Sequence, residues 1–479
     1  MRPSRFTVAV PVPDSTDTFL FNTLTDTQIV VSSDVTAFLG GLETRESVLS
    51  TVERDTAKEL ITLGFVVESA EAEDAALESF FRDLREDHHH LRVTLLTTLQ
   101  CNFACDYCIQ GDHGEYNATA AKMSPDTARR VQAWIEERLD ALRPERFTIT
   151  FFGGEPLLNL PVLYQLAEGL FAACTSRGVG MAINVITNGL LLTEAVVDRL
   201  APYGLNGVKV TLDGDQATHD RLRPLRGGQG TFDRIMRNLT AVAGKVRVSI
   251  GGNFDLDSAG SYPALLEHLR AQPFADQIVK VAFKPIIRTP ISSAVSEPSG
   301  AVPQTSSRVI PLRAVADATE VLQGTCMTAA GSGRAGSPCD SCHAVDDRMS
   351  WLRAETQARG FSTLDGVHMG PCELHRRHAY TIGPEGSLYP CPGFTGEARL
   401  SVGHIEPELD SQRTATRDQF EHHEPWRACG DCSLIPVCGG GCSVASHTEQ
   451  GDLSLPSCHR PSMLDAVGDL AAACAPQHA

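Results

Sequence analysis

The sequence has no long hydrophobic run and little positive charge. None of its apolar runs approaches the ~18–20 residues that a membrane-spanning helix needs. The N-terminal stretch MRPSRFTVAVPVPDSTD has neither a long apolar core nor an A-x-A site, so we expect no secretory signal. The 41 lysines and arginines are outnumbered by 59 aspartates and glutamates, which gives a net charge of −18. Because such a surface repels phosphate backbones and anionic lipids, we expect neither a nucleic acid nor a membrane as a partner.

Cysteine is absent from the first 100 residues and clustered in the remainder. Of the 15 cysteines, three lie within residues 101–108 and five between 429 and 458. They are too dilute for a disulfide scaffold in a chain of 479 residues. In a reducing compartment, clustered cysteines favour metal binding or catalysis over disulfides. We therefore expect a cytoplasmic protein that uses its thiols.

Residues 1–88 have the pattern of a small α+β domain. The segment LFNTLTDTQIVV alternates as a β-hairpin does, and Ser33 begins a short helix that Gly40 and Gly41 are expected to end. The run His88–His90 is expected to be a solvated linker to the next domain.

Residues 89–300 alternate short apolar strands with helices, which implies a parallel sheet covered by helices. About five or six βα units fit either an incomplete TIM barrel or a doubly wound sheet. In both folds, functional groups gather at the C-terminal ends of the strands. The expected strands are 91–98, 147–152, 181–187, 207–213, 246–254 and 278–285, with helices near 124–141, 160–176, 193–201, 231–243 and 261–271.

Residues 301–479 combine a linker with a cysteine-rich segment. The linker is rich in Ser, Pro, Gly and Ala and has one expected helix, over 311–323. After residue 370, long apolar periodic segments are too few for a large core. Metal clusters could supply the missing cross-links, as they do in other small modules.

Cys101, Cys105 and Cys108 follow the first expected strand with the spacing C-x3-C-x2-C. Three thiolates on one tight loop can hold three irons of a [4Fe–4S] cube and leave the fourth iron open. Structural zinc sites use four protein ligands. The barrel triad, as we call these three cysteines, is therefore better suited to a catalytic cofactor than to structural zinc.

The stretch LTTLQCNFACDYC resembles the signature C-x3-C-x-aromatic-C of the radical S-adenosylmethionine (SAM) enzymes, with Tyr107 at the aromatic place. The resemblance implies a partial (β/α)6 TIM barrel rather than a doubly wound sheet. It also implies that SAM binds the open iron of the triad's cluster. Reductive cleavage would then give methionine and a 5′-deoxyadenosyl radical, which abstracts a hydrogen atom from the substrate.

The second expected strand ends in Gly153, Gly154 and Glu155, followed by proline. Without the resemblance, this is a glycine-rich turn from strand to helix. Glycines also let backbone polar groups approach a ligand closely. The resemblance assigns the three residues to the methionyl amino group of SAM.

Two further motifs stand at expected strand ends. Asn188 lies in a segment that resembles the family's ribose-contacting stretch. Asp213 lies in LDGDQATHDRLR, which is similar to the LDG…HD..R element of peptide-modifying members. Arg223 ends that element and is implied as a partner of the SAM carboxylate, since guanidinium matches carboxylate geometry. A surface arginine in a loop is the alternative interpretation.

Seven cysteines between residues 372 and 458 do not divide evenly into zinc tetrads. Their spacing resembles the SPASM extension of radical SAM maturases, which binds two auxiliary [4Fe–4S] clusters. The resemblance divides them into an outer set, Cys429, Cys432, Cys438 and Cys458, and an inner set, Cys372, Cys391 and Cys442.

The fourth ligand of the inner set stays open. No cysteine lies between residues 372 and 391, so Cys326, Cys339 or Cys342 could complete the set, or the site could stay open for substrate. Cys174 and Cys474 are expected to be bystanders.

The implied function is a radical SAM maturase that installs a thioether or carbon–carbon cross-link in a ribosomally made peptide. Its implied partners are the precursor peptide or protein and an electron donor of the flavodoxin or ferredoxin type. Residues 1–88 resemble the winged-helix-like elements that bind precursor peptides. Pro392, after Cys391, replaces the carboxylate that sulfatase-maturing members carry there.

Other functions stay open at this point. Within the superfamily, the chain could mature a folded enzyme subunit or dehydrogenate a small molecule. A multi-cluster electron carrier would need neither the barrel triad nor the GGEP element. A zinc-dependent nucleic-acid binder is disfavoured by the net charge of −18.

We predict that protein reconstituted anaerobically with iron and sulfide binds about 12 irons per chain, because each of three cubes holds four. Iron and sulfide analysis, with the brown charge-transfer absorption of the clusters, measures this. Stoichiometric zinc without iron would contradict the prediction.

Overall fold

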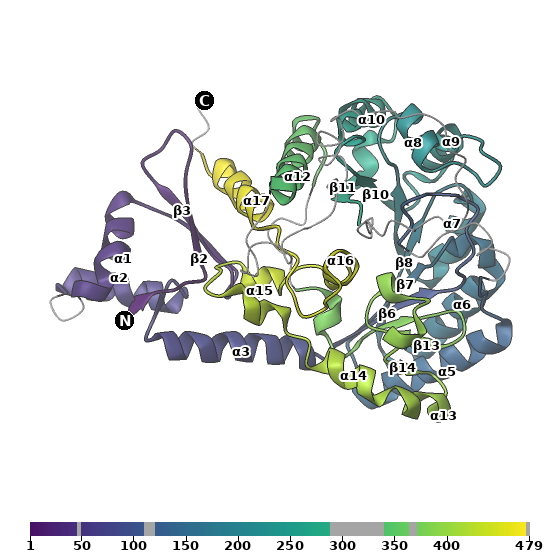
Figure 1. Cartoon of the computed structure of the whole chain (residues 1–479), viewed down its shortest axis with the longest axis horizontal. Coiled ribbons are helices and arrows are strands. Elements are labelled where there is room, and N and C mark those ends of the chain that lie inside the picture. Colours follow the sequence, from purple (N-terminus) through teal and green to yellow (C-terminus); the bar gives the residue numbers. More distant parts are fainter. Residues whose placement is uncertain (46–48, 110–119, 288–339, 364–370, 476–479) are drawn as a thin grey trace, which may run out of the picture.

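The structure, a computed structural model, describes residues 1–45, 49–109, 120–287, 340–363 and 371–475. An N-terminal lobe and a barrel lie at opposite ends of the molecule, with most of the cysteine-rich C-terminal segment between them (Figure 1). The expected helix over 311–323 falls outside the described residues.

Six neighbouring parallel strands form the barrel part of a nine-stranded sheet. Their spatial order follows their order in the chain, from β6 at one side to β11 at the other. A doubly wound sheet instead reverses its strand order at a switch point. The partial barrel is therefore confirmed, with strands β6 (His90–Leu96), β7 (Arg146–Phe152), β8 (Gly180–Thr187), β9 (Leu205–Thr211), β10 (Arg247–Phe254) and β11 (Ile278–Pro285).

Alternation along these strands separates the two faces of the sheet. In β6, Leu91, Val93 and Leu95 are buried in the main hydrophobic cluster, whereas Arg92 and Thr94 between them are only half-buried. The buried face packs under the helices that connect the strands. These helices are α5 (Pro125–Leu142), α6 (Leu160–Arg177), α7 (Glu194–Leu200), α8 (Gln216–Leu222), α9 (Phe232–Val242) and α10 (Tyr262–Arg270).

One described segment, 156–177, is long and apolar enough by composition to cross a membrane. It contains α6, whose Leu163, Leu166 and Leu170 are fully buried in the main cluster of the barrel. Its apolar character is explained by this packing.

The C-terminal segment adds three strands to the same sheet. β12 (Ala379–Ile382) pairs in parallel with β6, and β13 (Ser387–Tyr389) and β14 (Gly403–His404) continue outward. The sequence pattern did not predict this pairing. Helix α12 (Asp340–Ala358) packs against β11, so Leu352 belongs to the barrel's hydrophobic cluster. The remaining helices are α13 (Pro407–Asp410), α14 (Thr414–Glu421), α15 (Ile435–Cys438), α16 (Ser443–Ala445) and α17 (Arg460–Ala473).

The N-terminal lobe contains a three-stranded antiparallel sheet in the order β2–β3–β4. The expected hairpin is β3–β4, whereas β2 was not foreseen. The lobe's elements are β1 (Arg2–Pro3), β2 (Thr7–Pro11), β3 (Thr18–Asn22), β4 (Thr27–Val31), α1 (Ser33–Arg45), α2 (Thr51–Thr62), β5 (Val66–Val67) and α3 (Ala70–Glu86).

Two expectations for this lobe were wrong. Helix α1 continues through Gly40 and Gly41, because Leu42 beyond them is buried in the lobe's core and its packing outweighs the ~1 kcal/mol that each helical glycine costs. His90 is not in a linker but begins β6, where its Nε2 lies 2.8 Å from Thr148 Oγ1. Burial and the Arg92 guanidinium lower the pKa of His90 to about 4.

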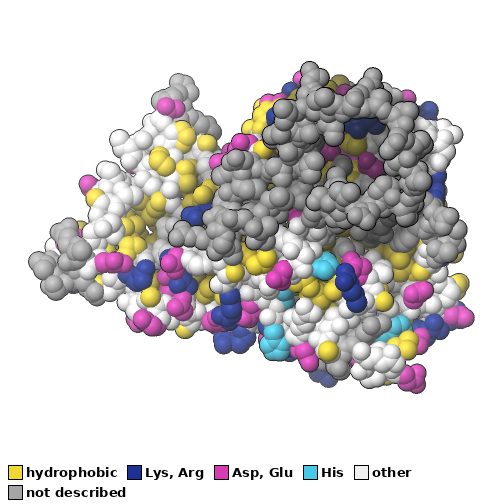
Figure 2. All heavy atoms as spheres, viewed as in Figure 1, with side chains coloured by type: hydrophobic (Ala, Val, Ile, Leu, Met, Phe, Trp, Pro, Cys, Tyr) yellow, Lys and Arg dark blue, Asp and Glu magenta, His cyan; other side chains and the backbone are white. Residues whose placement is uncertain are grey.

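On the face shown in Figure 2, lysines and arginines are interspersed with aspartates and glutamates along the lower rim of the molecule. No large area of one sign is visible among the coloured side chains of this face.

We predict that Asn159→Ala destabilises the barrel by about 2 kcal/mol, because it removes two buried hydrogen bonds. Asn159 Nδ2 donates to Thr97 O at 2.9 Å and to Met123 O at 3.0 Å. Thermal unfolding measures the loss. The matched control is Asn206→Ala, which removes one exposed hydrogen bond, from Asn206 Nδ2 to Asn184 Oδ1. Equal stability of the two variants would contradict the prediction.

Candidate active site

The barrel triad lies on the loop after β6, at the C-terminal end of the barrel. Cys101 is buried, and Cys105 and Cys108 are partly buried. Burial raises the pKa of Cys101 to about 12, with the Glu155 carboxylate acting in the same direction. Burial raises the pKa of Cys105 to about 11, although the Arg223 guanidinium opposes the rise. Cys105 lies within electrostatic range of both other thiols, and none of the three is in a disulfide among the described residues.

Two glycines bring the end of β7 against this loop. A Cβ on Gly153 would lie 2.2 Å from Thr98 O, and a Cβ on Gly154 would lie 2.3 Å from Gln100 O. Gly153 also has a φ of +138°, which disfavours any other residue. Without side chains at these two positions, the backbones lie close enough for Gly154 N to donate a hydrogen bond to Thr98 O at 2.9 Å.

The Glu155 carboxylate joins the ends of β7 and β8. It is fully buried and accepts hydrogen bonds from Leu157 N at 3.0 Å, Thr187 Oγ1 at 2.8 Å and Asn188 N at 2.8 Å. Burial raises the pKa of Glu155, and these hydrogen bonds oppose the rise. The chain itself therefore uses both carboxylate oxygens, and the contact with the amino group of SAM stays a prediction.

The Asn188 side chain contacts the loop of the barrel triad. Its Nδ2 donates to Asn102 Oδ1 at 2.7 Å and lies 3.9 Å from Cys101 Sγ. Its Oδ1 accepts from Leu190 N at 3.0 Å, which fixes the amide orientation. The end of β8 is thus joined to the residues around the first cysteine.

Tyr107, Asp213 and Arg223 form one buried polar network. Asp213 is fully buried, and its Oδ1 accepts from Asn253 N at 2.7 Å. Its Oδ2 accepts from Tyr107 Oη and lies 3.4 Å from Arg223 Nη1. Arg223 Nη1 also donates to Tyr107 Oη at 2.6 Å. Burial raises the pKa of Tyr107 well above its usual range, so the phenol keeps its proton.

The geometry of α8 explains the spacing of the LDG…HD..R element. Asp213 N donates to His219 Nδ1 at 3.2 Å, while His219 Nε2 lies 3.0 Å from Thr231 Oγ1. Burial lowers the pKa of His219 well below its usual range, so this ring is neutral. Asp220 Oδ1 accepts from the backbone N–H of Thr231 at 2.7 Å. Arg223, at the end of α8, is thereby directed back toward Asp213.

The inner set is brought together by the C-terminal segment. Burial raises the pKa of Cys391 to about 12, and the neighbouring thiols of Cys372 and Cys442 act in the same direction. The ammonium of Lys284, at the end of β11, opposes this rise. The proposed candidates for a fourth ligand, Cys326, Cys339 and Cys342, have no described side chains.

The outer set also converges. Burial raises the pKa of Cys429 to about 12, and the thiols of Cys438, Cys432 and Cys458 add to the rise in that order. The four cysteines are free thiols. Among the described residues, no three His, Cys, Asp or Glu side chains are arranged to share a single metal ion. Three groups of mainly partly buried thiols, with no disulfide among the described residues, fit the ligand chemistry of iron–sulfur cubes.

Cys174 and Cys474 lie apart from these groups. Cys174 is buried on α6 within the barrel's hydrophobic cluster, and burial raises its pKa to about 11. Cys474 is exposed at the end of α17. Nothing in their surroundings assigns them a role.

The superfamily model described as "Radical SAM superfamily" matches residues 95–253, which contain the barrel triad and the three other strand-end motifs. This chain carries a radical SAM domain. The expected enzyme class is thereby confirmed, and the domain implies SAM and one [4Fe–4S] cluster as cofactors.

Several curated proteins are similar to this chain. Mycofactocin maturase MftC of Mycolicibacterium smegmatis is 24% identical over 373 residues, which cover 74% of this chain and 78% of that protein. The serine-type anaerobic sulfatase-maturating enzyme of Klebsiella aerogenes is 28% identical over 141 residues, covering 29% of this chain and 34% of the relative. AdoMet-dependent heme synthase of Methanosarcina barkeri is 28% identical over 143 residues, covering 30% and 36%. The chain thus spans only about a third of the length of the last two relatives.

Two solved structures are similar to this chain, with TM-scores below 0.5. Native anSMEcpe with bound AdoMet has 16% identity and a TM-score of 0.48, covering 79% of this chain and 97% of that one. Streptococcus suis SuiB bound to S-adenosylmethionine has 15% identity and a TM-score of 0.43, covering 95% and 98%. With TM-scores below 0.5, neither likeness supports more than the sequence already does.

Sequence reasoning did not single out several residues that lie beside the candidate site residues. Asn102, Asn253 and Lys284 carry no motif signal, because their place depends on the strand register and on the C-terminal segment. His219 and Asp220 were visible as the HD of the quoted element, and only the structure shows what they bind.

We predict that Asp213→Asn weakens SAM binding by the cluster-loaded enzyme by about tenfold, because a charge-assisted contact of 1–3 kcal/mol with Arg223 is lost. Equilibrium dialysis of SAM measures the affinity, and iron analysis verifies that the cluster content is unchanged. Asp198→Asn, which alters an exposed carboxylate paired with Lys245, is the matched control. SAM affinity equal to that of the control would refute a role for Asp213.

Proposed function

We propose that this chain is a radical SAM maturase that installs a thioether or carbon–carbon cross-link in a ribosomally made peptide. The main support is the likeness to mycofactocin maturase, which extends over 74% of the chain and therefore well beyond the matched domain. A likeness of the domain alone would leave the substrate class open. The proposal therefore rests on the length of the alignment with mycofactocin maturase, 373 residues, and not on the 24% identity.

In this proposal the barrel triad holds the SAM-binding cluster, and the inner and outer sets hold two auxiliary clusters. When bound, the first cluster and SAM supply a 5′-deoxyadenosyl radical that takes a hydrogen atom from the peptide. A flavodoxin or ferredoxin provides the electrons. The barrel and the C-terminal segment exclude water from the radical.

The chain's own contribution to SAM binding is a fixed guanidinium. Arg223 is nearly buried, and Tyr107 and Asp213 hold its Nη1. Its Nε is buried and has no hydrogen-bond partner among the described residues. A buried, unsatisfied cationic donor is costly, and a carboxylate from the amino-acid end of SAM would satisfy it. In the proposal, Asn188, whose Nδ2 lies 3.9 Å from Cys101 Sγ, would contact the ribose.

Residues 1–88 would recognise the precursor. The sheet order β2–β3–β4 leaves β4 paired on one side only among the described strands. An extended peptide can add to such an edge and gain main-chain hydrogen bonds, while the rest of the peptide enters the barrel. Val30 of β4 is 44% exposed and lies opposite Phe19 in the register. A side chain of the added strand would contact it.

The test of the function combines the anaerobically reconstituted enzyme, SAM, a reductant and each short peptide encoded by the reading frames that adjoin the gene. We expect 5′-deoxyadenosine and a change in peptide mass to accumulate together, and Cys105→Ala to abolish both. 5′-deoxyadenosine formation by Cys105→Ala would refute the assignment of the triad. An unmodified peptide would refute the maturase.

We predict that Val30→Asp weakens precursor binding by about tenfold, because a charge at this edge opposes burial of an added strand. Fluorescence anisotropy of a labelled precursor measures the affinity. Val52→Asp is the matched control, since Val52 is also exposed, at 75%, but lies on α2. Equal losses in the two variants would remove β4 as the docking edge.

A further inference from the structure

The chain between Cys429 and Cys438 packs against the N-terminal lobe through two hydrophobic clusters. In one, Leu434 and Val437 pack with side chains of β2 and β3 and of α17, and Cys432 and Cys438 border this cluster. In the other, Ile435 packs with residues of the N-terminal lobe. The lobe's contributors are Val8, Val12, Phe19 and Phe21 to the first cluster and Phe6, Leu77 and Phe81 to the second.

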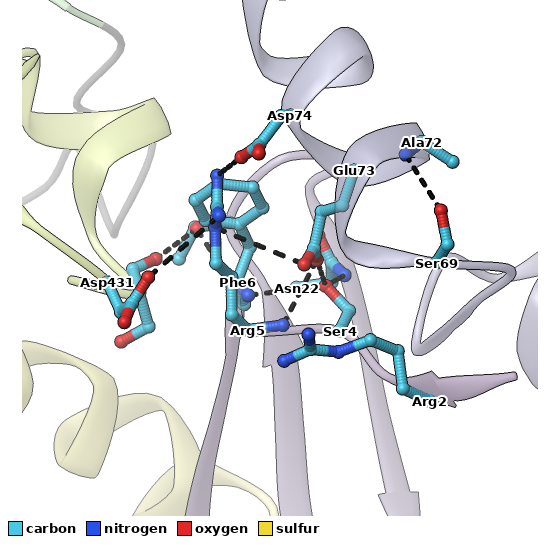
Figure 3. Close-up of polar contacts among 12 residues, drawn as sticks. Arg2, Ser4, Arg5, Phe6, Asn22, Ser69, Ala72, Glu73, Asp74 and Asp431 are labelled. Carbon is cyan, nitrogen blue, oxygen red and sulfur yellow. Dashed lines mark hydrogen bonds and ion pairs between the residues drawn. The ribbon is translucent and has the colours of Figure 1, made fainter. Parts of the chain in front are cut away.

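Polar contacts join the same two parts. Thr23 Oγ1 donates to Ser433 O at 2.5 Å, and Arg5 Nη1 lies 3.9 Å from Asp431 Oδ1. Figure 3 shows the Arg5 guanidinium between Asp431 on one side and Asp74 of α3, 2.6 Å away, on the other. Arg5 thus connects α3 to the segment that carries Cys429, Cys432 and Cys438, three of the four cysteines of the outer set.

A buried carboxylate fixes the backbone from which Arg5 extends. Glu73 of α3 is 1% exposed and accepts from Ser4 Oγ at 2.6 Å and from Arg5 N at 3.0 Å (Figure 3). Asn22 of β3 donates to the same Ser4 hydroxyl at 3.2 Å. The lobe therefore presents a preformed surface to the cysteine segment.

An aromatic stack completes the contact. The rings of Phe81 and Trp426 are parallel within 2°, with centroids 4.4 Å apart. Trp426 lies three residues before Cys429 and is 3% exposed. Such pairs contribute beyond the area that they bury.

We propose that the outer set has a second function, which is to hold the N-terminal lobe in its docked position. This inference needs one part of the proposed function, namely that the outer set binds an auxiliary iron–sulfur cluster. Docking would then require the four cysteines to be joined, so a chain without this cluster would present its precursor-binding lobe undocked. Loading of the cluster would precede productive recognition of the peptide.

The physical reason is that the segment has little structure of its own. Its regular elements are a five-residue 3-10 helix, Pro425–Cys429, and the four-residue α15. Gly439, Gly440 and Gly441 follow in conformations with positive φ. Helices this short are unstable without external support, and cross-links between ligands supply it in small metal-held modules.

The coupling must be reciprocal. If ligation of the outer set stabilises docking, docking must stabilise ligation by the same free energy. Loss of contacts in the lobe should therefore weaken retention of the cluster, although no residue of the lobe belongs to the set.

The first test uses Cys458→Ser in the full-length protein. Cys458 belongs to the outer set but to neither hydrophobic cluster, so the change leaves the docking surface intact. Hydrogen–deuterium exchange should increase about tenfold or more in residues 6–12, 18–23 and 70–86 as the lobe opens. Cys105→Ser, in the barrel triad, is the matched control and should leave these peptides protected. Equal protection in both variants overturns the inference.

The second test measures the reverse coupling. Arg5→Gln should raise about threefold or more the ratio of released to bound auxiliary iron at equilibrium with a chelator, measured in a Cys105→Ser background so that only auxiliary iron is followed. Arg2→Gln is the matched control, because Arg2 contacts Glu43 within the lobe instead of Asp431. Identical release from both variants overturns the inference. Neither test uses the peptide or turnover, so failure of the maturase assignment would be seen separately.

Discussion

The site depends on the close packing of two backbones, the end of β7 and the loop that carries the barrel triad. There is no room for a side chain at Gly153 or Gly154, where a Cβ would lie within 2.4 Å of a carbonyl oxygen. This contact fixes the loop before any cofactor is bound. Glu155, the next residue, extends the fixed region to β8 through its buried carboxylate. A single turn therefore aligns the triad with two strand ends.

The opposite wall of the site is held by charge rather than by close packing. Asp213 is anchored by the backbone of β10 and in turn holds the phenol of Tyr107 and the guanidinium of Arg223. Because Tyr107 lies between Cys105 and Cys108 in sequence, this network reaches the triad from the other side. The cysteine loop is thus restrained at both ends, by hydrogen bonds of different kinds.

Much of this arrangement could be predicted from local patterns. The barrel strands follow from periodicity and the triad from its spacing, whereas the motifs at the strand ends were recognised through the resemblance to radical SAM enzymes. Parallel strands bring their C-terminal ends, and so these motifs, to one edge. The pairing of β12 with β6 could not be predicted, because register between strands more than 280 residues apart leaves no local signal. The continuation of helix α1 beyond Gly40 and Gly41 could not be predicted for a similar reason. It depends on the burial of Leu42 in the core of the lobe, which is a tertiary contact. Glu155 shows a third limit of prediction from sequence. The motif singles out this residue, but it does not reveal that the carboxylate accepts hydrogen bonds from the chain itself, such as the one from Leu157 N.

The parallel pairing of β12 with β6 has a mechanical consequence. Two strands joined by main-chain hydrogen bonds cannot slide gradually past each other. A shift of one residue breaks every hydrogen bond between them and turns each side chain to the other face of the sheet. Along the β6 side, barrel and C-terminal segment must therefore move as one rigid body, from Ala379↔Arg92 to Ile382↔Leu95. Any opening of the barrel that admits a bulky substrate must therefore occur away from the β6 edge of the sheet.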